Sequence, residues 1–348
     1  GPFAAMVLAN LGAKVLRIAS PASRTQPPFN PVLDRGRCGE LVIDLKSPAG
    51  RTQLLGLIEQ ADVLIEGFRP GVMERLGIGP DQCLTRNAQL IYGRITGWGR
   101  DGPLAQTPGH DINYLALSGA LHASGSRDSG PWPALNLVAD FGGGGMLLAL
   151  GIASALFESG ISGKGQVVDA AMIDGSAMLM SMIYGLRANG RWPAARAGNF
   201  LDGSAYYYTT YRCADGGWVA VGAIEPAFRR ALFAGLGLSD AAESLMQARD
   251  DDPAVREKLA AIFARHPRAH WQQVFEHSDA CVSPVLAIDE AADHPQNLAW
   301  GSVRRVDGIN QPCAAPHFSR TPTAAWSANA ASPDRSQWYL DGIDPASE

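Results

Sequence analysis

The chain has 348 residues, of which 46% are hydrophobic and 18% charged, with a formal net charge of −5. At ~100–200 residues per domain this length predicts about two domains, and the composition is typical of a globular protein. So small a negative net charge provides no overall field to hold a nucleic acid, and we expect no nucleic-acid partner. The five cysteines are odd in number and lack CxxC spacing, which indicates unpaired thiols in a reducing compartment.

The longest apolar stretch runs from Phe141 to Phe157 and contains four consecutive glycines near its start. It is shorter than the ~20 residues of a membrane span. We therefore expect a buried core helix and no membrane partner. The sequence has no signal-peptide pattern and no peroxisomal tripeptide, which predicts a cytoplasmic protein.

Helical and strand patterns alternate through the first half of the chain. Ser47 followed by Pro48 is a typical helix start. Such alternation predicts a doubly wound, Rossmann-like parallel sheet. A domain of this kind normally begins with a strand, whereas this chain opens with a helix, so we expect its first strand to be missing. The predicted helices cover residues 3–11, 47–60, 143–157 and 172–187, and the predicted strands cover 14–18, 62–66, 89–95, 136–139 and 166–169.

The pattern changes after about residue 190, where a β-hairpin is predicted. We therefore expect a large α/β domain over residues 1–190 and a smaller α+β domain over 205–290. The segment 291–348 is expected to return to the large domain. Within the small domain, strands are predicted at 206–212, 218–223 and 282–287, and helices at 226–236, 252–265 and 267–278.

His110 stands in a predicted loop just before an apolar helix. A single histidine is more often structural, but a helix start presents unpaired amides to ligands, which favours a functional role. Asp140 follows a predicted strand and precedes Gly142, which is the crevice position where open α/β sheets bind ligands. The alternative is a helix-capping aspartate. A nucleotide-binding loop is less favoured, because the four glycines lack GxGxxG spacing.

Other candidates are weaker when only local sequence is considered. Glu225 precedes a proline at a helix start, where a surface role is the simpler interpretation. Several methionines fall on one predicted helix, where they suit either core packing or a pocket for varied acyl chains. Basic residues of the first hundred positions are either solvated charges or phosphate contacts. The methionines are Met172, Met178, Met180 and Met182, and the basic residues are Arg35, Arg37, Lys46, Arg69 and Arg75.

Segments along nearly the whole chain resemble the family III CoA-transferase (CaiB/BaiF) superfamily, and within it the racemases of 2-methylacyl-CoA thioesters. Related transferases usually carry tyrosine at the position of His110, and GHDINYLALSG is close to a racemase signature. The segments that carry the resemblance are GPFAAMVLANLGAKVLRI, VIDLKS, ADVLIEGFRPGVMERLGIG, LIYGRITGWGRDGP, GHDINYLALSGAL, LNLVADFGGGG, GKGQVVDAAM, GAIEPAF and DACVSPVL.

The resemblance implies an isomerase that moves a proton between the two faces of the carbon next to the thioester carbonyl, through an enolate. His110 and Asp140 would be the two acid/base groups, and Glu225 would hold and polarise His110. Inversion of a carbon requires a base on one face and an acid on the other, which fits two groups at a fixed separation. We expect amides of the glycine-rich segment beside Asp140 to stabilise the enolate oxygen.

The resemblance also implies CoA-binding segments and an interlocked homodimer. The active site would lie between the large domain of one subunit and the small domain of the other. Racemases commonly carry arginine where this chain has Ser20, which puts one CoA contact in doubt. The implied CoA contacts are Ile43, Asp44, Leu45, Lys46, Gly67, Phe68, Arg69, Arg75, Gly109, Asp111, Ile112, Asn113 and Tyr114.

Two other functions stay open. A CoA transferase of the same family would use Asp140 as a nucleophile and carry a covalent intermediate. A non-catalytic binder of CoA esters is the third possibility, which the missing strand and Ser20 keep open. None of these needs a separate cofactor, because coenzyme A is part of the substrate, and the sequence shows no metal-binding cluster or nicotinamide fingerprint.

Overall fold

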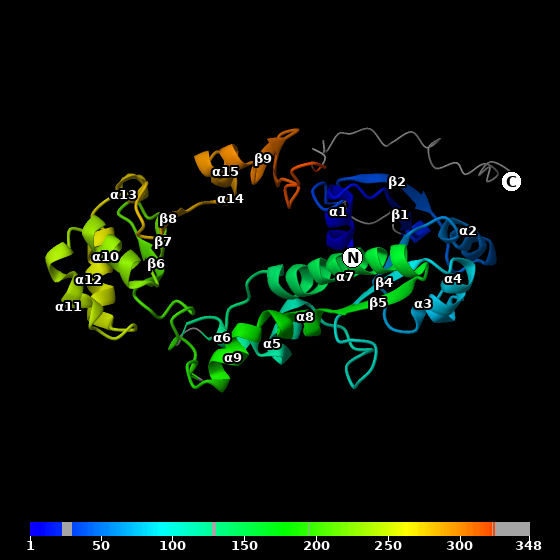
Figure 1. Cartoon of the computed structure of the whole chain (residues 1–348), viewed down its shortest axis with the longest axis horizontal. Coiled ribbons are helices and arrows are strands. Elements are labelled where there is room, and N and C mark those ends of the chain that lie inside the picture. The colour runs from blue at the N-terminus through cyan, green and yellow to red at the C-terminus, as the bar shows by residue number, and fades with distance from the viewer. Residues whose placement is uncertain (23–29, 127–129, 194, 322, 324–348) are drawn as a thin grey trace. The chain divides into compact units, whose positions relative to one another are not determined.

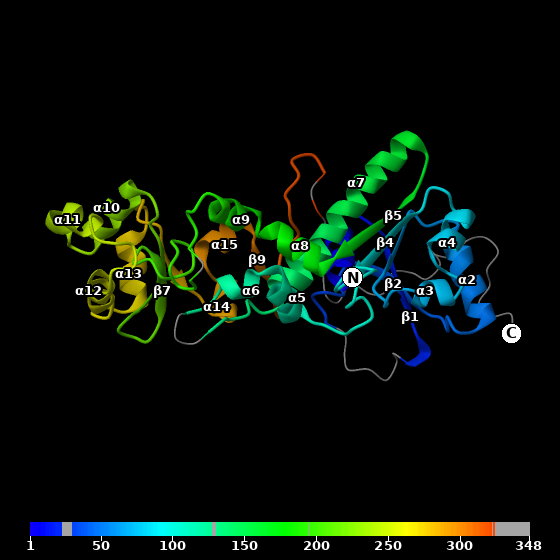
Figure 2. The same ribbon diagram turned by 90° about the horizontal axis from the view of Figure 1, so that it is seen from below.

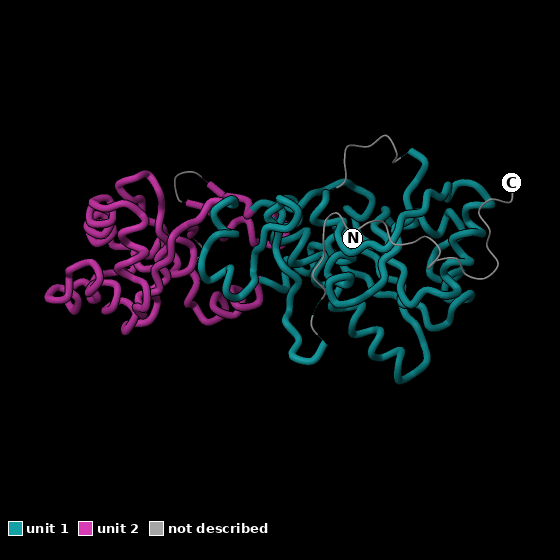
Figure 3. The backbone as a smooth tube through the Cα atoms, turned by 90° about the horizontal axis from the view of Figure 1, so that it is seen from above, with its two compact units in different colours: residues 1–115, 135–179, 288–348 teal, residues 116–134, 180–287 magenta. Residues whose placement is uncertain are grey.

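The computed structural model describes residues 1–22, 30–126, 130–193, 195–321 and 323. The chain divides into two compact units (Figure 3). The first unit contains residues 1–115, 135–179 and 288–348, and the second contains 116–134 and 180–287. The predicted C-terminal segment beyond residue 323 lies outside the described residues.

Two parallel sheets form the centre of the first unit. β1 (Val15–Ala19) pairs with β2 (Arg37–Val42), and the second sheet has the order β3 (Val63–Glu66), β4 (Ile91–Thr96), β5 (Gln166–Ala171). β4 is buried along its whole length, as expected for a strand between two parallel neighbours. The prediction of an α/β fold with parallel strands is confirmed, although β2 lies where the sequence predicted no strand.

Helix α7 (Leu147–Ser162) runs alongside β5 and packs on β4 (Figures 1 and 2). Leu148 and Ile152 lie over Gly93, where an added Cβ would come within 2.9 Å of the Ile152 Cδ1 atom. The apolar core between this helix and the sheet therefore needs a glycine in the middle of the central strand. The remaining elements of the first unit are α1 (Pro2–Asn10), α2 (Pro48–Ile58), α3 (Val72–Arg75), α4 (Pro80–Arg86), α5 (Asp111–Ser118, whose last residues belong to the second unit), η2 (Leu137–Met146), α8 (Met172–Leu179), α14 (Ile288–Ala291), α15 (Pro295–Trp300), and the antiparallel strands β9 (Val303–Val306) and β10 (Ile309–Pro312).

The predicted strand at residues 136–139 is wrong. Residues Leu137–Met146 form η2, a π-helix that continues directly into α7. The combined helix, Leu137–Ser162, has 26 residues and is long and apolar enough to cross a membrane. However, Leu148, Ala149, Ile152 and Ala155 are buried within the first unit. One face of α7 therefore serves as the expected core helix, while its other face stays exposed.

The glycines of η2 allow neighbouring elements to approach closely. An added Cβ at Gly145 would lie 2.8 Å from the Phe3 ring, and one at Gly144 would lie 2.9 Å from the Met172 side chain. At Gly175 on α8, an added Cβ would lie 1.9 Å from the Gly143 carbonyl oxygen. Since that contact is with backbone, no side-chain rotation relieves it.

Replacing Gly175 with alanine is therefore expected to lower stability by at least the ~1–3 kcal/mol typical of overpacked cores. The two helices must separate, because the clash is between backbone and Cβ. Urea unfolding of the purified variant measures the effect. The matched control is Gly160→Ala on α7, where nothing lies within 4 Å of the added Cβ. Equal stability of the two variants would contradict the close crossing of α8 and η2.

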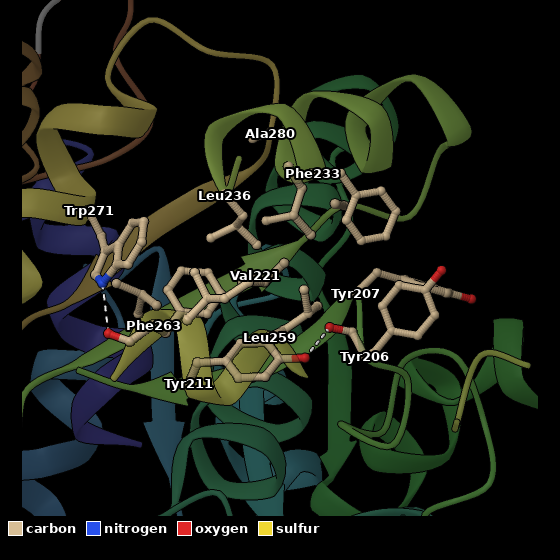
Figure 4. Close-up of a cluster of buried hydrophobic side chains, with 14 of the residues drawn as sticks. Tyr206, Tyr207, Tyr211, Val221, Phe233, Leu236, Leu259, Phe263, Trp271 and Ala280 are labelled. Atoms are coloured by element: carbon tan, nitrogen blue, oxygen red, sulfur yellow. Dashed lines mark hydrogen bonds between the residues drawn. The ribbon is translucent and has the colours of Figure 1, made fainter. Parts of the chain in front are cut away.

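The second unit contains a three-stranded antiparallel sheet covered by helices. Its aromatic core holds Tyr206, Tyr211, Phe263 and Trp271 (Figure 4). The Tyr211 hydroxyl donates to the Tyr206 carbonyl at 2.6 Å, and Trp271 Nε1 donates to the Phe263 carbonyl at 2.8 Å, so both of these buried donors are satisfied. The elements are α6 (Ala120–Ala123), α9 (Ser181–Ala188), β6 (Tyr208–Arg212), β7 (Trp218–Gly222), α10 (Pro226–Gly235), η3 (Ser239–Ala241), α11 (Ala242–Met246), α12 (Pro253–Phe263), α13 (Arg268–Phe275) and β8 (Val282–Val285), with sheet order β6-β7-β8.

The predicted hairpin and the three following helices of this unit are confirmed. The single helix predicted over 172–187 is wrong, because the chain forms two helices, α8 and α9, that meet at Met180. Met178 and Met182 are both 56% exposed. These two methionines therefore do not fill the core of the described structure, which was one of the two interpretations.

Candidate active site

His110 ends the loop after β4 and stands directly before α5. Its amide donates to Oδ1 of Asn113 at 3.0 Å, and its carbonyl accepts from the Asn113 amide at 2.8 Å. This reciprocal pair resembles a capping box and fixes the backbone at the helix start. His110 itself is exposed. The imidazole is thus presented to solvent from a well-defined turn.

Asp140 lies in the first turn of η2 and is only partly exposed. Its amide and that of Ala139 donate to Oδ2 of Asp111, at 2.9 and 2.7 Å. Amides at a helix start have no acceptor within the helix, so a carboxylate there is stabilising. Asp111 is 4% exposed and follows His110 directly. A single buried carboxylate therefore joins the turn that carries His110 to the turn that carries Asp140.

Burial raises the pKa of Asp140, and the negative charge of Asp111 raises it further. A hydrogen bond from the Asn136 side chain and the charge of His110 act in the opposite direction. The influence of His110 places its imidazole within electrostatic range of the Asp140 carboxyl group. Asp140 consequently keeps its proton to a higher pH than an ordinary aspartate does.

A histidine and a carboxyl group of raised pKa are the side chains most suited to move a proton on and off a substrate. The site offers both, with His110 exposed and Asp140 partly exposed. Within the described ranges, no group of three or more His, Cys, Asp or Glu side chains is placed to hold a metal ion. His110 and Asp140 are thus two side chains of the first unit that are able to give up and take back a proton.

The Tyr114 side chain packs against the turn that carries His110. Its ring meets Trp98 edge-on, with 4.7 Å between centroids, and an added Cβ at Gly109 would lie 2.8 Å from the Tyr114 ring. An added Cβ at Gly97 would lie 2.3 Å from the Tyr114 hydroxyl oxygen. Burial raises the pKa of Tyr114, with a further rise from the charge of Asp140. This packing explains why glycine precedes His110.

The glycine-rich segment beside Asp140 does not form the expected oxyanion site. Gly142–Gly145 lie inside η2, where their amides take part in helical hydrogen bonding. Gly143, Gly144 and Gly145 are buried against neighbouring elements. These glycines serve helix packing, so the sequence-based prediction of glycine amides as oxyanion donors is wrong.

Glu225 belongs to the second unit, where it is exposed at the N-terminal end of α10. It lies near Cys281, whose pKa is raised by burial and then by the negative charge of Glu225. The structure thus brings His110 and Asp140 together in the first unit. The contact between Glu225 and His110 stays a prediction.

The segments predicted to bind CoA follow the C-terminal ends of parallel strands. Residues 43–46 follow β2, residues 67–69 follow β3, and the loop to residues 109–114 follows β4. Open α/β sheets bind ligands in this position. Lys46, Arg69 and Arg75 are exposed and supply positive charge there. Ile43, Asp111 and Tyr114 have buried side chains, so only their backbone is available to a ligand.

Two of the predicted basic residues have structural roles instead. Arg35 is buried and donates to the Gln311 side chain at 3.1 Å and to the Pro312 carbonyl, which ties the segment before β2 to β10. Arg37 forms an ion pair with Asp34. These two guanidinium groups are engaged within the protein, so the interpretation of Arg35 and Arg37 as phosphate contacts is wrong.

The sequence did not single out two features of this region. One is the buried carboxylate of Asp111, which was predicted only as a CoA contact. The other is Arg94 on β4, which is 2% exposed and forms ion pairs with Glu66 and Glu74. A charged residue inside the apolar run Leu90–Thr96 was an available signal, because such residues are seldom fully buried unless paired.

The chain resembles known proteins in sequence and in fold. The chain is 46% identical to the human alpha-methylacyl-CoA racemase over 323 residues, which cover 92% of this chain and 84% of that protein. It is 31% identical to the acetyl-CoA:oxalate CoA-transferase of Acetobacter aceti, over 90% of this chain and 84% of that protein. Among solved structures, a CAIB/BAIF family protein from Brucella suis superposes with a TM-score of 0.77 at 24% identity, covering 97% of this chain and 93% of the other. The family model for CoA-transferase family III matches residues 1–334, and the chain therefore belongs to that family.

Proposed function

We propose that this protein is an alpha-methylacyl-CoA racemase, an isomerase that interconverts the two configurations at carbon 2 of 2-methylacyl-CoA thioesters. The observation that supports it most is the pairing of His110 with Asp140 through the buried Asp111 carboxylate. The similarity to a racemase over most of the chain supports the same substrate class.

In this proposal, His110 and Asp140 face opposite sides of the carbon next to the thioester carbonyl. One group removes the proton as a base, and the other returns a proton from the opposite side as an acid. A raised pKa suits Asp140 to this exchange, because its protonated form persists to higher pH. Reversal of the reaction reverses the two roles. Glu225 is proposed to orient the imidazole of His110.

The enolate formed between the two steps requires hydrogen-bond donors at the carbonyl oxygen. Within the described residues, the amides of Asp111 and Ile112 donate no hydrogen bond, whereas the next two amides of α5 donate to the His110 carbonyl. We therefore assign the amides at the start of α5 to the enolate oxygen, in place of the glycines of η2. One such donor is typically worth about 3–4 kcal/mol in a transition state.

The nucleotide part of the substrate is proposed to bind along the strand ends, with its phosphates on Lys46, Arg69 and Arg75. Exposed guanidinium and ammonium groups at the ends of parallel strands suit phosphate oxygens. The sheet is proposed to be doubly wound and Rossmann-like. Cytoplasmic localisation also remains our proposal, supported by the five unpaired cysteines.

A homodimer is proposed as the working form. The exposed face of η2 and α7 carries large apolar side chains at Met146, Leu150, Phe157 and Ile161, which are 47%, 62%, 75% and 77% exposed. Their spacing of four, seven and four residues puts them on one side of the helix. An apolar stripe of this kind marks a surface that a partner covers. We assign it to the second copy of the chain.

A CoA transferase is the second candidate, because the family and several relatives carry that name. Its mechanism needs Asp140 as an ionised nucleophile. His110 beside Asp140 counts against that role, because a transfer that uses the carboxylate alone gives the histidine no task.

Deuterium exchange tests the proposal directly. Each enantiomer of a short 2-methylacyl-CoA is incubated with the enzyme in D₂O, and NMR follows the α-position. Loss of the α-proton from both enantiomers, with formation of the opposite configuration, is the expected result. Retention of the α-proton on both enantiomers would refute the racemase. Transfer of CoA to a free acid, with a mass adduct on Asp140, would establish the transferase instead.

A further inference from the structure

Arg94 lies in β4 with its side chain 3% exposed, at the C-terminal half of the central strand. Its Nε atom lies 3.7 Å from Oε1 of Glu66 on β3, and its NH2 group lies 3.2 Å from Oε1 of Glu74 on α3. Asp169 occupies the paired position on β5. Removal of a buried arginine from water is costly unless acids surround it. This guanidinium therefore holds the carboxylates of Glu66 and Glu74, from two different elements, in fixed positions.

Glu66 passes the influence of Arg94 to the segment after β3. While Oε1 faces Arg94, Oε2 accepts from the Phe68 amide at 2.7 Å. Burial raises the pKa of Glu66, and the Phe68 hydrogen bond and the charge of Arg94 oppose this rise. Lysine at this position would keep the positive charge, but it lacks the planar guanidinium that faces Glu66 and Glu74 with separate nitrogen atoms. Arg94 thus fixes the turn that begins Gly67-Phe68-Arg69.

Glu74 connects Arg94 to α3 in the same way. It is the residue before Arg75, and its Oε1 atom accepts from Arg94 at 3.2 Å and from Arg100 at 3.3 Å. α3 has only four residues, Val72–Arg75, and so short a helix has few hydrogen bonds of its own to hold it in place. The two exposed arginines proposed to meet phosphate, Arg69 and Arg75, are therefore both connected to the buried Arg94.

We propose that Arg94 is a positioning residue for the nucleotide part of the CoA thioester: it touches no substrate, but through Glu66 and Glu74 it sets the segments that carry Arg69 and Arg75. The inference rests on the proposed function for the identity of the ligand. It predicts a separation of binding from chemistry, because His110 and Asp140 are held independently, by Asp111.

The test compares two substrates and three variants. The substrates are a 2-methylacyl-CoA and the matching 2-methylacyl-pantetheine, which lacks the nucleotide phosphates. The test variants are Arg94→Lys and Glu74→Ala. The control is Glu59→Gln, which removes an exposed ion pair with Arg86 away from Arg94 and Glu74. Glu74 is 37% exposed, so its variant tests the same connection if Arg94→Lys fails to fold.

Arg94→Lys and Glu74→Ala are expected to raise KM for the CoA ester roughly 2–30-fold, with kcat and turnover of the pantetheine ester within about twofold of wild type. The control is expected to match wild type on both substrates. Unchanged KM in both variants, or an equal loss on the two substrates, would overturn the positioning role. Direct titration with CoA distinguishes failure of the proposed function from failure of the role of Arg94. If the wild-type protein binds no CoA, the proposed function is overturned as well. If the variants bind CoA as tightly as the wild type does, only the role of Arg94 is overturned.

Discussion

Replacement of Asp140 with asparagine is expected to slow interconversion of 2-methylacyl-CoA enantiomers by about 10²–10⁴-fold, the usual contribution of one general acid or base. Asparagine keeps the size of the side chain and neither takes up nor releases a proton at neutral pH. The Ala139 and Asp140 amides bonded to Asp111 are backbone groups, so they remain in the variant. The loss should therefore appear in kcat, with KM for the CoA ester nearly unchanged.

The proposed pair of bases, His110 and Asp140, also predicts which hydrogen exchange remains in each variant. With Asp140 replaced, His110 still reaches one face of the α-carbon, so the enantiomer with its proton on that face should exchange deuterium without inversion. His110→Ala should show the mirror result, with exchange of the other enantiomer only. Exchange of both enantiomers at equal rates in either variant would contradict two bases on opposite faces. Asp62→Asn, at an exposed carboxylate outside the site, is the matched control and should behave as wild type.

The sequence predicted most strands of the first unit, because β1, β3, β4 and β5 are apolar runs bounded by polar residues. β2 was missed, since its first four residues, Arg37-Cys38-Gly39-Glu40, carry charges at both ends. The segment before Asp140 was taken for a strand because a short apolar run does not distinguish a buried strand from a buried helix. The helical form is stabilised by the close contacts of Gly143 with α8. These are tertiary contacts, which the local sequence does not reveal.

The candidate site, too, was only partly predictable from the sequence. His110 and Asp140 were identifiable from local motifs that resemble a known family. The connection between them was not, because the Asp111 carboxylate meets the Asp140 amide across 29 residues of sequence. Likewise, only the packed structure separates Arg35, which is engaged by Gln311, from exposed Arg69 and Arg75. Local sequence gives the chemistry of each side chain, and the fold decides which of them meet.

Replacement of Asp111 is expected to have the second large effect, because its carboxylate both holds the start of η2 and repels the charge of Asp140. In Asp111→Ala, the amides of Ala139 and Asp140 lose their acceptor within the protein. An unsatisfied buried donor costs about 1–3 kcal/mol, so urea unfolding should show a loss of this order. Racemisation should fall as well, since Asp140 is no longer held relative to His110.

Asp111→Asn separates geometry from charge. Its side-chain oxygen still accepts a hydrogen bond from the η2 amides, while the negative charge that raises the pKa of Asp140 is gone. Burial remains the larger cause of that rise, so the pKa of Asp140 should move only part of the way to its ordinary value. The rate limb that needs protonated Asp140, which falls as pH increases through that pKa, should shift to lower pH.

The raised pKa of Asp140 also determines how the stability of the protein depends on pH. A carboxyl group whose pKa is raised by folding binds its proton more tightly in the folded state, so stability falls as pH rises from the ordinary aspartate pKa through the raised value. This decrease should be smaller in Asp111→Asn than in wild type, and the variant should be more stable at neutral pH than Asp111→Ala. Urea unfolding at several pH values measures both differences. A rate profile for Asp111→Asn that coincides with wild type, together with equal stability of the two variants, would show that Asp111 neither tunes nor holds Asp140.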